Sequence, residues 1–286
     1  MTAAHSQFRS PLLPFAGICL TALLLAGCGP TGTNLLGNGP RIAEVEAPDA
    51  SFSDNIASLS DVVKRNPESP DAYNTRGAAY ARAGRYQEAI ADFTQAIRIN
   101  PNHAAAYVNR ALANRQINRN DQALADFNRA IEANPRHAPA FLGRANLLRT
   151  QGALTEALAD LDQAIRLAPE DAQAFHARGL IHQRNGNHPR AITDFDNAID
   201  RNPFVAAPYQ ARGQSLIEIG KYDAAVEDFN ATLNVNNRNA DAWAGLGLAY
   251  ERLGNKPKAV ESYERALVVE PNHKLARDGR ARLGRS

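Results

Sequence analysis

Cysteine, net charge and long apolar runs are all scarce in this chain of 286 residues. It has only two cysteines, and its 32 basic residues nearly balance 30 acidic ones. A balance this even does not indicate a nucleic-acid partner. The longest apolar run, residues 12–27, is too short and too soon interrupted to predict a membrane-spanning helix.

Motifs of the common enzyme classes are also missing. The chain has no HExxH zinc motif and no phosphate-binding loop. The Gly-Gln-Ser sequence at residues 213–215 lacks the second glycine of a nucleophile elbow. His176, His182 and His188 are spaced by six residues, whereas zinc ligands on one helix need a spacing of three or four. We therefore predict no catalytic residue, no metal site and no cofactor.

What the chain does have is a period of 34 residues. Proline recurs at this interval from Pro67 to Pro203, Asn237 takes the next place, and Pro271 follows. A period of this length predicts stacked supersecondary units rather than one globular core. With Pro70 as position 1, the six units are 70–103, 104–137, 138–171, 172–205, 206–239 and 240–273.

Four positions are filled alike in all six units. Position 4 is aromatic, position 8 is glycine or alanine, position 20 is alanine, and position 24 is large and apolar or aromatic. Helical spacing puts positions 4 and 8 on one face, and positions 20 and 24 on another. The small residues would let two helices approach closely, and the aromatic residues would fill the space around that contact. Glycine at position 15, or Asn118 in the second unit, predicts a turn with positive φ between the helices.

This pattern resembles the tetratricopeptide repeat family over residues 70–273. The resemblance implies an all-α fold, a right-handed superhelical solenoid of six helix-turn-helix repeats whose first helices line a concave groove. Residues 53–69 resemble an N-terminal half repeat, and residues 274–286 resemble a polar C-terminal capping helix that covers the last apolar face. The family binds peptides or protein segments and rarely catalyses a reaction.

The amino terminus resembles a bacterial lipoprotein signal. A basic residue precedes the apolar run, which ends in Leu-Ala-Gly-Cys at residues 25–28. The resemblance implies a signal peptide at 1–27 and lipid on Cys28; an ordinary signal peptide that happens to end in cysteine is the alternative. Residues 28–52 then form the lipidated end and a flexible tether. Gly29 implies, by resemblance to Gram-negative lipoproteins, an outer-membrane anchor facing the periplasm.

Arginine and aspartate are patterned together. Position 7 is arginine and position 23 is aspartate in the first five units, and both are lost in the sixth, at Leu246 and Ser262. We therefore predict a structural Arg–Asp pair inside each of the first five repeats. A row of ligand-binding arginines is the alternative.

The resemblance places positions 2, 5, 9, 12 and 13 of each first helix in the groove. The polar residues predicted there are Asn74, Arg82, Arg115, Gln116, Asn146, Arg149, His176, Gln183, Arg184, Gln210 and Gln214. With Glu218 and Glu251 in the last two repeats, the groove would be basic at one end and acidic at the other and would orient an extended segment. Solvated helix ends are the alternative. The Lys/Asn/Arg clamp by which some members of the family hold chaperone tails is not matched.

Signal, tether and repeats together resemble the NlpI type of lipoprotein, a family that scaffolds peptidoglycan hydrolases and presents them to a periplasmic protease. The layout predicts a membrane-anchored adaptor that binds envelope proteins and no nucleic acid. One alternative is an assembly factor for a pilus or secretion complex, with one dominant membrane-embedded partner. Another is a lytic envelope enzyme, which would need an acidic pair in a closed pocket. Whether the protein forms a homodimer is left open.

Overall fold

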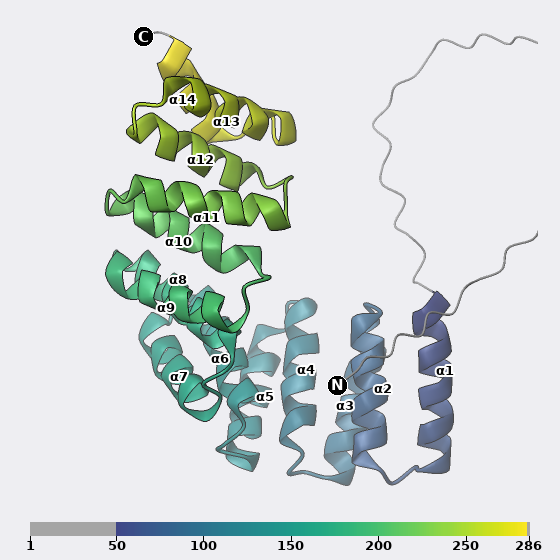
Figure 1. The fold of residues 1–286 in the computed structure, drawn as a ribbon. Helices are drawn as coiled ribbons and strands as arrows, with labels where there is room; N and C mark the ends of the chain where they lie inside the picture. Colours follow the sequence, from purple (N-terminus) through teal and green to yellow (C-terminus); the bar gives the residue numbers. More distant parts are fainter. Residues whose placement is uncertain (1–49, 285–286) are drawn as a thin grey trace, which may run out of the picture. The chain divides into compact units, whose positions relative to one another are not determined.

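The computed structural model describes residues 50–284, which form helices and connecting turns with no strand (Figure 1). The helices are α1 (Ala50–Arg65), α2 (Pro70–Arg82), α3 (Tyr86–Ile99), α4 (Ala104–Gln116), α5 (Asn120–Ala133), α6 (Ala138–Gln151), α7 (Leu154–Leu167), α8 (Ala172–Arg184), α9 (His188–Arg201), α10 (Ala206–Glu218), α11 (Tyr222–Val235), α12 (Ala240–Arg252), α13 (Lys256–Val269) and α14 (Lys274–Gly284). The predicted signal peptide, Cys28 and nearly all of the tether lie outside the described residues. No helix within the described range has both the length and the apolar character to cross a membrane.

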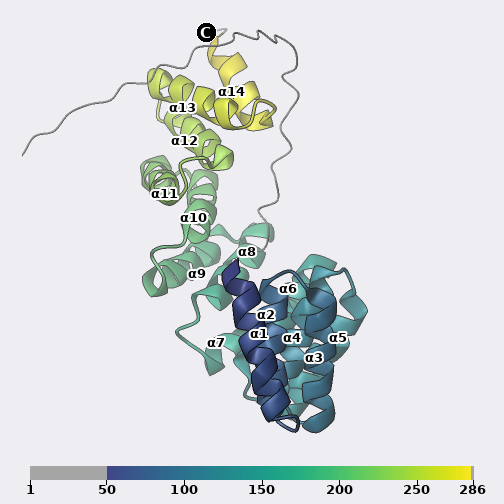
Figure 2. The same ribbon diagram turned by 90° about the vertical axis from the view of Figure 1, so that its right-hand side faces the viewer.

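Consecutive helices pack against each other as hairpins, and the hairpins stack in chain order (Figure 1, Figure 2). The even-numbered helices from α2 to α14 also contact their even-numbered neighbours, whereas the odd-numbered helices of the described range do not contact one another. The even-numbered helices, which are the first helices of the repeats, therefore form the inner side of the stack. The all-α repeat solenoid predicted from the sequence is confirmed.

A residue in the left-handed region follows the first helix of every repeat. The backbone φ lies between 72° and 84° at Gly84, Gly152, Gly186, Gly220 and Gly254. Asn118 adopts a φ of 60° at the same position of the second repeat, which asparagine tolerates better than most residues. The turn predicted at position 15 is confirmed.

The position-24 side chain is the centre of each repeat. Five of the six are rings at most 1% exposed: Phe93, Phe127, Phe195, Phe229 and Tyr263. A Cβ added to Gly77, at position 8, would lie 2.7 Å from the Phe93 ring. Carbon atoms in contact prefer about 3.5–4 Å, so position 8 must stay small for the ring to lie against the helix.

The rings of Phe127, Phe229 and Tyr263 also meet position 6 of the next repeat or its equivalent in α14, which the repeat pattern did not reveal. Gly143 and Gly245 occupy this position, and Gly279 takes the equivalent place in α14. A Cβ at Gly143 would overlap the ring of Phe127 in the preceding repeat. These three side chains thus join the following repeat or the cap to the two helices of their own repeat.

The position-4 aromatics are less buried than predicted. Only Phe141 and Phe175 are buried, and the aromatics of the other four repeats are half-buried. The position-7 arginine lies beside these rings wherever a repeat has one. In the first five repeats this guanidinium carbon lies 5.7–5.9 Å from the centre of the position-4 ring, within the range of a cation–π contact.

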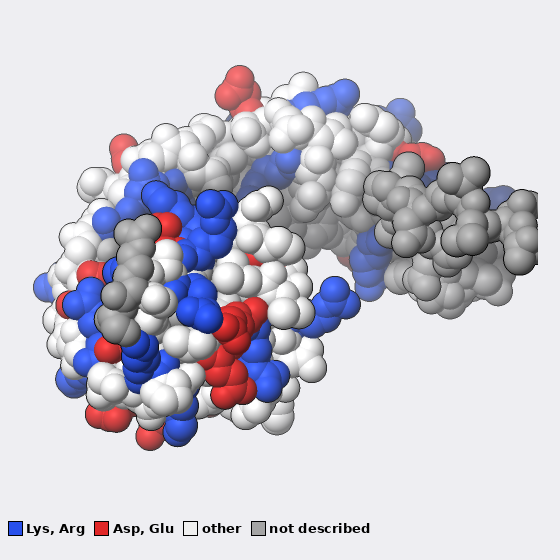
Figure 3. All heavy atoms as spheres, turned by 90° about the horizontal axis from the view of Figure 1, so that it is seen from above, with Lys and Arg blue, Asp and Glu red and all other residues white. Residues whose placement is uncertain are grey.

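Helix α14 covers the last repeat, as expected of a cap. Arg280 Nε donates a hydrogen bond to Glu264 at 2.8 Å, and Arg282 donates to both carboxylate oxygens of Glu251 at 2.9 Å. Seen from above, acidic side chains lie among the basic ones over this end of the stack (Figure 3). These two cap arginines are therefore paired with the chain's own carboxylates.

Candidate binding groove

The predicted Arg–Asp pairs are present in the first five repeats. The pairs are Arg76–Asp92, Arg110–Asp126, Arg144–Asp160, Arg178–Asp194 and Arg212–Asp228. In each, Nε and Nη2 donate to the two carboxylate oxygens at 2.6–3.0 Å, the bidentate geometry that suits a guanidinium. The hydrogen bond to Asp228 raises the pKa of Arg212 above its ordinary value.

Each of these arginines also donates a hydrogen bond to the preceding repeat or half repeat, which was not predicted from the sequence. Nη1 donates to a side-chain oxygen there, at 2.6–3.4 Å: Ser60, Thr94, Asn128, Asp162 and Asp196. The guanidinium groups are thereby shared between the two repeats that they join. They act as structural bridges, and the alternative of a row of ligand-binding arginines is not supported.

Three of the predicted groove residues are engaged within the protein. Asn74 accepts a hydrogen bond from Asn109 at 2.9 Å. Gln183 donates to the carbonyl oxygen of Ala211 and to the hydroxyl of buried Ser215, at 2.8 and 2.9 Å. Gln210 accepts from Asn239 at 2.7 Å. The first two contacts join successive repeats, and the third joins Gln210 to the last residue of its own repeat, so all three amides are engaged within the protein.

The predicted acidic end of the groove is also altered. Glu251 accepts hydrogen bonds from Arg282 and from the hydroxyl of Tyr263, and these bonds lower its pKa. Its charge is therefore balanced by the cap. Of the two glutamates expected to make this end of the groove acidic, only Glu218 is exposed.

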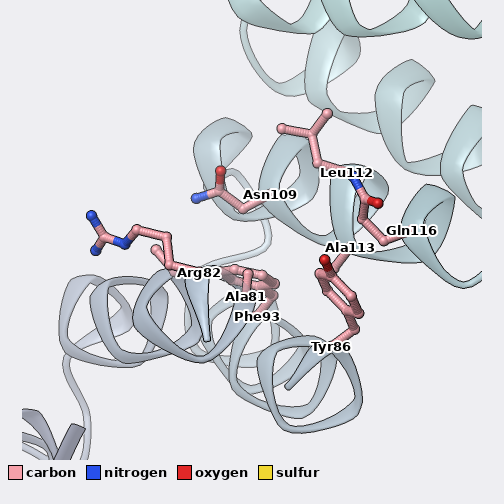
Figure 4. Close-up of a pocket in the computed structure, with 9 residues that line it drawn as sticks. Ala81, Arg82, Tyr86, Phe93, Asn109, Leu112, Ala113 and Gln116 are labelled. Carbon is pink, nitrogen blue, oxygen red and sulfur yellow. The ribbon is translucent and has the colours of Figure 1, made fainter. Parts of the chain in front are cut away.

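A cavity of about 380 Å³ lies between the first two repeats on the inner side (Figure 4). We call it the Leu112 pocket; it is lined by Ala78, Ala81, Arg82, Tyr86, Phe93, Asn109, Leu112, Ala113 and Gln116. Most of its wall is apolar. Figure 4 shows Arg82 at one side and Gln116 at the other, with Leu112 on the α4 side, across from Ala81 and Phe93. Leu112 is 41% exposed, which is unusual for leucine in this fold.

Arg115 and Arg149, together with the neighbouring imidazole of His176, form what we call the cation cluster. They come from three successive first helices, α4, α6 and α8, and each is half-buried. Burial, and after it the charge of Arg149, lowers the pKa of both Arg115 and His176. The Arg149 Nε atom is buried and has no hydrogen-bond partner. No carboxylate pairs with any of the three within the described range.

The remaining predicted residues do not join this cluster. Arg184 and Gln214 are exposed and Asn146 is half-buried, and none of their side chains forms a hydrogen bond within residues 50–284. Of the three histidines considered as ligands, His182 lies 3.8 Å from Asp194 and His188 has a buried, unpartnered Nδ1. Over the same residues, no three potential metal ligands gather closely enough to hold an ion.

Replacing Arg149 by glutamine is expected to stabilise the fold by about 0.3–1 kcal/mol, because the change relieves repulsion between like charges. The matched control is Arg144→Gln in the same helix, which breaks the pair with Asp160 and should destabilise. Urea unfolding followed by circular dichroism measures both. A loss of stability in Arg149→Gln would mean that Arg149 has a structural partner.

Acidification from about pH 7 to about pH 5.5 is expected to lower the melting temperature. Burial lowers the pKa of His137, His176 and His182 from the ordinary value of 6.5. The unfolded chain therefore binds more protons than the folded chain in this window, so its free energy falls relative to the folded state. Thermal unfolding at constant ionic strength measures the effect, and His176→Gln should reduce it. A melting temperature independent of pH in this range would contradict the prediction.

Two family models, both described as tetratricopeptide repeat, match the chain. One covers residues 70–103 and the other covers 108–172 and 211–274, together more than half of the chain. No curated protein is significantly similar to the chain in sequence.

Many solved structures share the fold. YrrB, "a TPR protein with an unusual peptide-binding site", is 26% identical, with a TM-score of 0.58 over 66% of this chain and 97% of that one. PilF of Pseudomonas aeruginosa is 19% identical, with a TM-score of 0.69 over 74% of this chain and 97% of that one. A chain of the APC/C hetero-tetramer Cut9-Hcn1 is 20% identical over 82% of this chain, with a TM-score of 0.69; the match spans only 47% of that chain.

The repeat pattern, the hairpin stack and the matching family models agree. Proteins built from these repeats are in general interaction scaffolds that bind other proteins rather than enzymes. The chain belongs to the tetratricopeptide repeat family.

Proposed function

We propose that this protein is a lipid-anchored adaptor of the bacterial cell envelope that binds segments of other proteins in its concave groove. The observation that carries the binding role is the pairing of the Leu112 pocket with the cation cluster on neighbouring first helices. An apolar pocket beside arginines that have no carboxylate partner suits an interface, where arginine is enriched. The peptide-binding site named for YrrB supports the same kind of ligand.

The anchor and the location are proposed from the sequence. Leu-Ala-Gly-Cys at residues 25–28 resembles a lipobox, and Cys28 would carry the lipid. Several acyl chains on one residue hold a protein firmly at a membrane, whereas one chain is marginal. Gly29 favours the outer membrane, with the repeats facing the periplasm. The layout resembles that of NlpI-type lipoproteins, so cell-wall hydrolases or a protease are the partners we propose.

Crosslinking in living cells tests both parts of the proposal. Membranes are separated, the anchored protein is isolated, and the crosslinked partners are identified by mass spectrometry. Cys28→Ser should move the protein out of the membrane fraction. Arg115→Glu with Arg149→Glu should leave it anchored and remove hydrolases or proteases from its partners. Partners unchanged by the double substitution would place the working surface outside the groove.

The second candidate is an assembly factor for a pilus or secretion complex. PilF and PilW, "widely conserved type IV pilus biogenesis factor", match this chain over 97% of their own lengths, and at 19% and 18% identity the likeness extends to the fold alone. The same crosslinking separates the candidates. A secretin or a pilus subunit as the dominant partner would favour the assembly factor over the adaptor.

A further inference from the structure

We propose that the groove recognises an extended segment in which an apolar residue and an acidic residue lie about three positions apart. The apolar side chain occupies the Leu112 pocket, and the carboxylate is held in the cation cluster. The proposal rests on the protein-binding function proposed above and names the chemistry of its ligand.

The cation cluster is the part of the groove that would bind the carboxylate. Arg115 and Arg149 lie close enough for the charge of one to disfavour the charge of the other, and no carboxylate of residues 50–284 compensates them. The position-7 arginines show the contrast, because each has a bidentate carboxylate partner in its own repeat. The Nε of Arg149 is buried without a hydrogen-bond partner, so no group of residues 50–284 satisfies this donor.

The Leu112 pocket is the part of the groove that would bind the apolar side chain. Its floor is made by Ala78, Ala81, Ala113 and Phe93, and its rim carries Arg82 and Gln116, both exposed. A cavity of about 380 Å³ lined in this way fits one large aliphatic or aromatic side chain. The polar rim can then contact the ligand's backbone.

Helix α4 joins the two sites and sets their spacing. Leu112 and Gln116 line the pocket, and Arg115, between them in sequence, belongs to the cluster. The pocket lies between α2 and α4, and the cluster begins between α4 and α6. Packed helices are roughly 8–10 Å apart, which an extended chain covers in about three residues. That distance gives the spacing between the apolar and the acidic residue.

An acidic protein segment fits these observations better than a polyanion does. A phosphate- or sulfate-bearing polymer would use the arginines and leave Leu112 without a role. Exposure of Leu112 beside unpaired cations is explained when one ligand carries both kinds of side chain. The two classes can be separated, because only the protein segment depends on the pocket.

The test is selection from a random library of short peptides displayed on phage, with the whole chain in detergent as bait. We expect peptides enriched in Asp or Glu at a fixed spacing from a large apolar residue. Selected peptides are then synthesised with a fluorescent label, and their affinities are measured by anisotropy at two salt concentrations. Binding should weaken at the higher salt concentration, because the cluster is partly exposed to solvent.

Three variants locate the two subsites. Arg115→Gln with Arg149→Gln should weaken binding of the selected peptides by about tenfold or more. Leu112→Ser should weaken it too, and should remove the preference for the apolar residue. Arg98→Gln with Arg166→Gln, two exposed arginines on the odd-numbered helices α3 and α7, is the charge-matched control and should bind normally.

The possible results distinguish a failure of this inference from a failure of the proposed protein-binding function. Peptides without acidic residues, or binding unaffected by the cluster variant, would overturn the inference and leave the peptide-binding function standing. Acidic peptides that bind Leu112→Ser normally would indicate a polyanion site instead and also overturn it. Failure to select any peptide would count against both. Because the cluster arginines pair with no carboxylate of the described range, their replacement is not expected to unfold the protein.

Discussion

Replacing Arg212 by leucine is expected to lower the free energy of unfolding by about 3–5 kcal/mol. The change removes both hydrogen bonds to Asp228, whose side chain is only 4% exposed, while Asp196, the second partner, is 48% exposed and can turn to water. A buried carboxylate without its partner keeps its desolvation cost and loses the attraction that offset it. Urea unfolding followed by circular dichroism measures the difference.

The sixth repeat provides the control for this prediction. It has Leu246 and Ser262 at the two positions, and Ser262 donates a hydrogen bond to the carbonyl oxygen of Lys258 at 2.8 Å. Arg212→Leu with Asp228→Ser therefore copies a pair that the chain already uses, and it should regain most of the lost stability. If the double variant were no more stable than Arg212→Leu, the cost would not come from a stranded carboxylate.

Replacing Gly143 by alanine is expected to cost about 1–3 kcal/mol, although alanine is the better helix former. The added Cβ would overlap the ring of Phe127, which is fully buried and lies between two repeats. Either the ring or the helix must shift, and a close-packed interior resists both. Thermal and urea unfolding measure the loss.

The interface between the next two repeats indicates a second substitution that should compensate for Gly143→Ala. There Leu161 takes the place of the ring, and Ala177 stands where Gly143 does, in the same buried cluster. Phe127→Leu should therefore make Gly143→Ala nearly harmless, and the double variant should be more stable than the sum of the single effects predicts. Gly213→Ala, whose Cβ would lie 3.1 Å from the Phe229 ring, should cost less than Gly143→Ala. Additive effects would show that Gly143 and Phe127 do not share the contact.

Some contacts could be predicted from the sequence and others could not, for physical reasons. The Arg–Asp pairs could be predicted because both members vanish together in the sixth repeat, at Leu246 and Ser262. Position 6 could not, because it holds glycine in only some repeats. In the fourth and fifth repeats the position holds alanine, beside Leu161 in one interface and beside the Phe195 ring in the other. What fits there depends on how each pair of repeats packs, so it leaves no uniform column in the sequence.

Sequence alone determined the repeat, its two helices, its turn and its internal ion pair. These depend on contacts within one repeat, so the same residue recurs wherever the same contact does. Only the tertiary structure decided which polar side chains of the groove are free. Asn74, Gln183, Gln210 and Glu251 are bound by groups 28–35 residues away, in the next repeat, at the end of the same repeat or in the cap. Arg115, Arg149 and His176 meet across three repeats with no carboxylate partner among the described residues. Such contacts depend on how neighbouring repeats pack, which a periodic pattern does not encode.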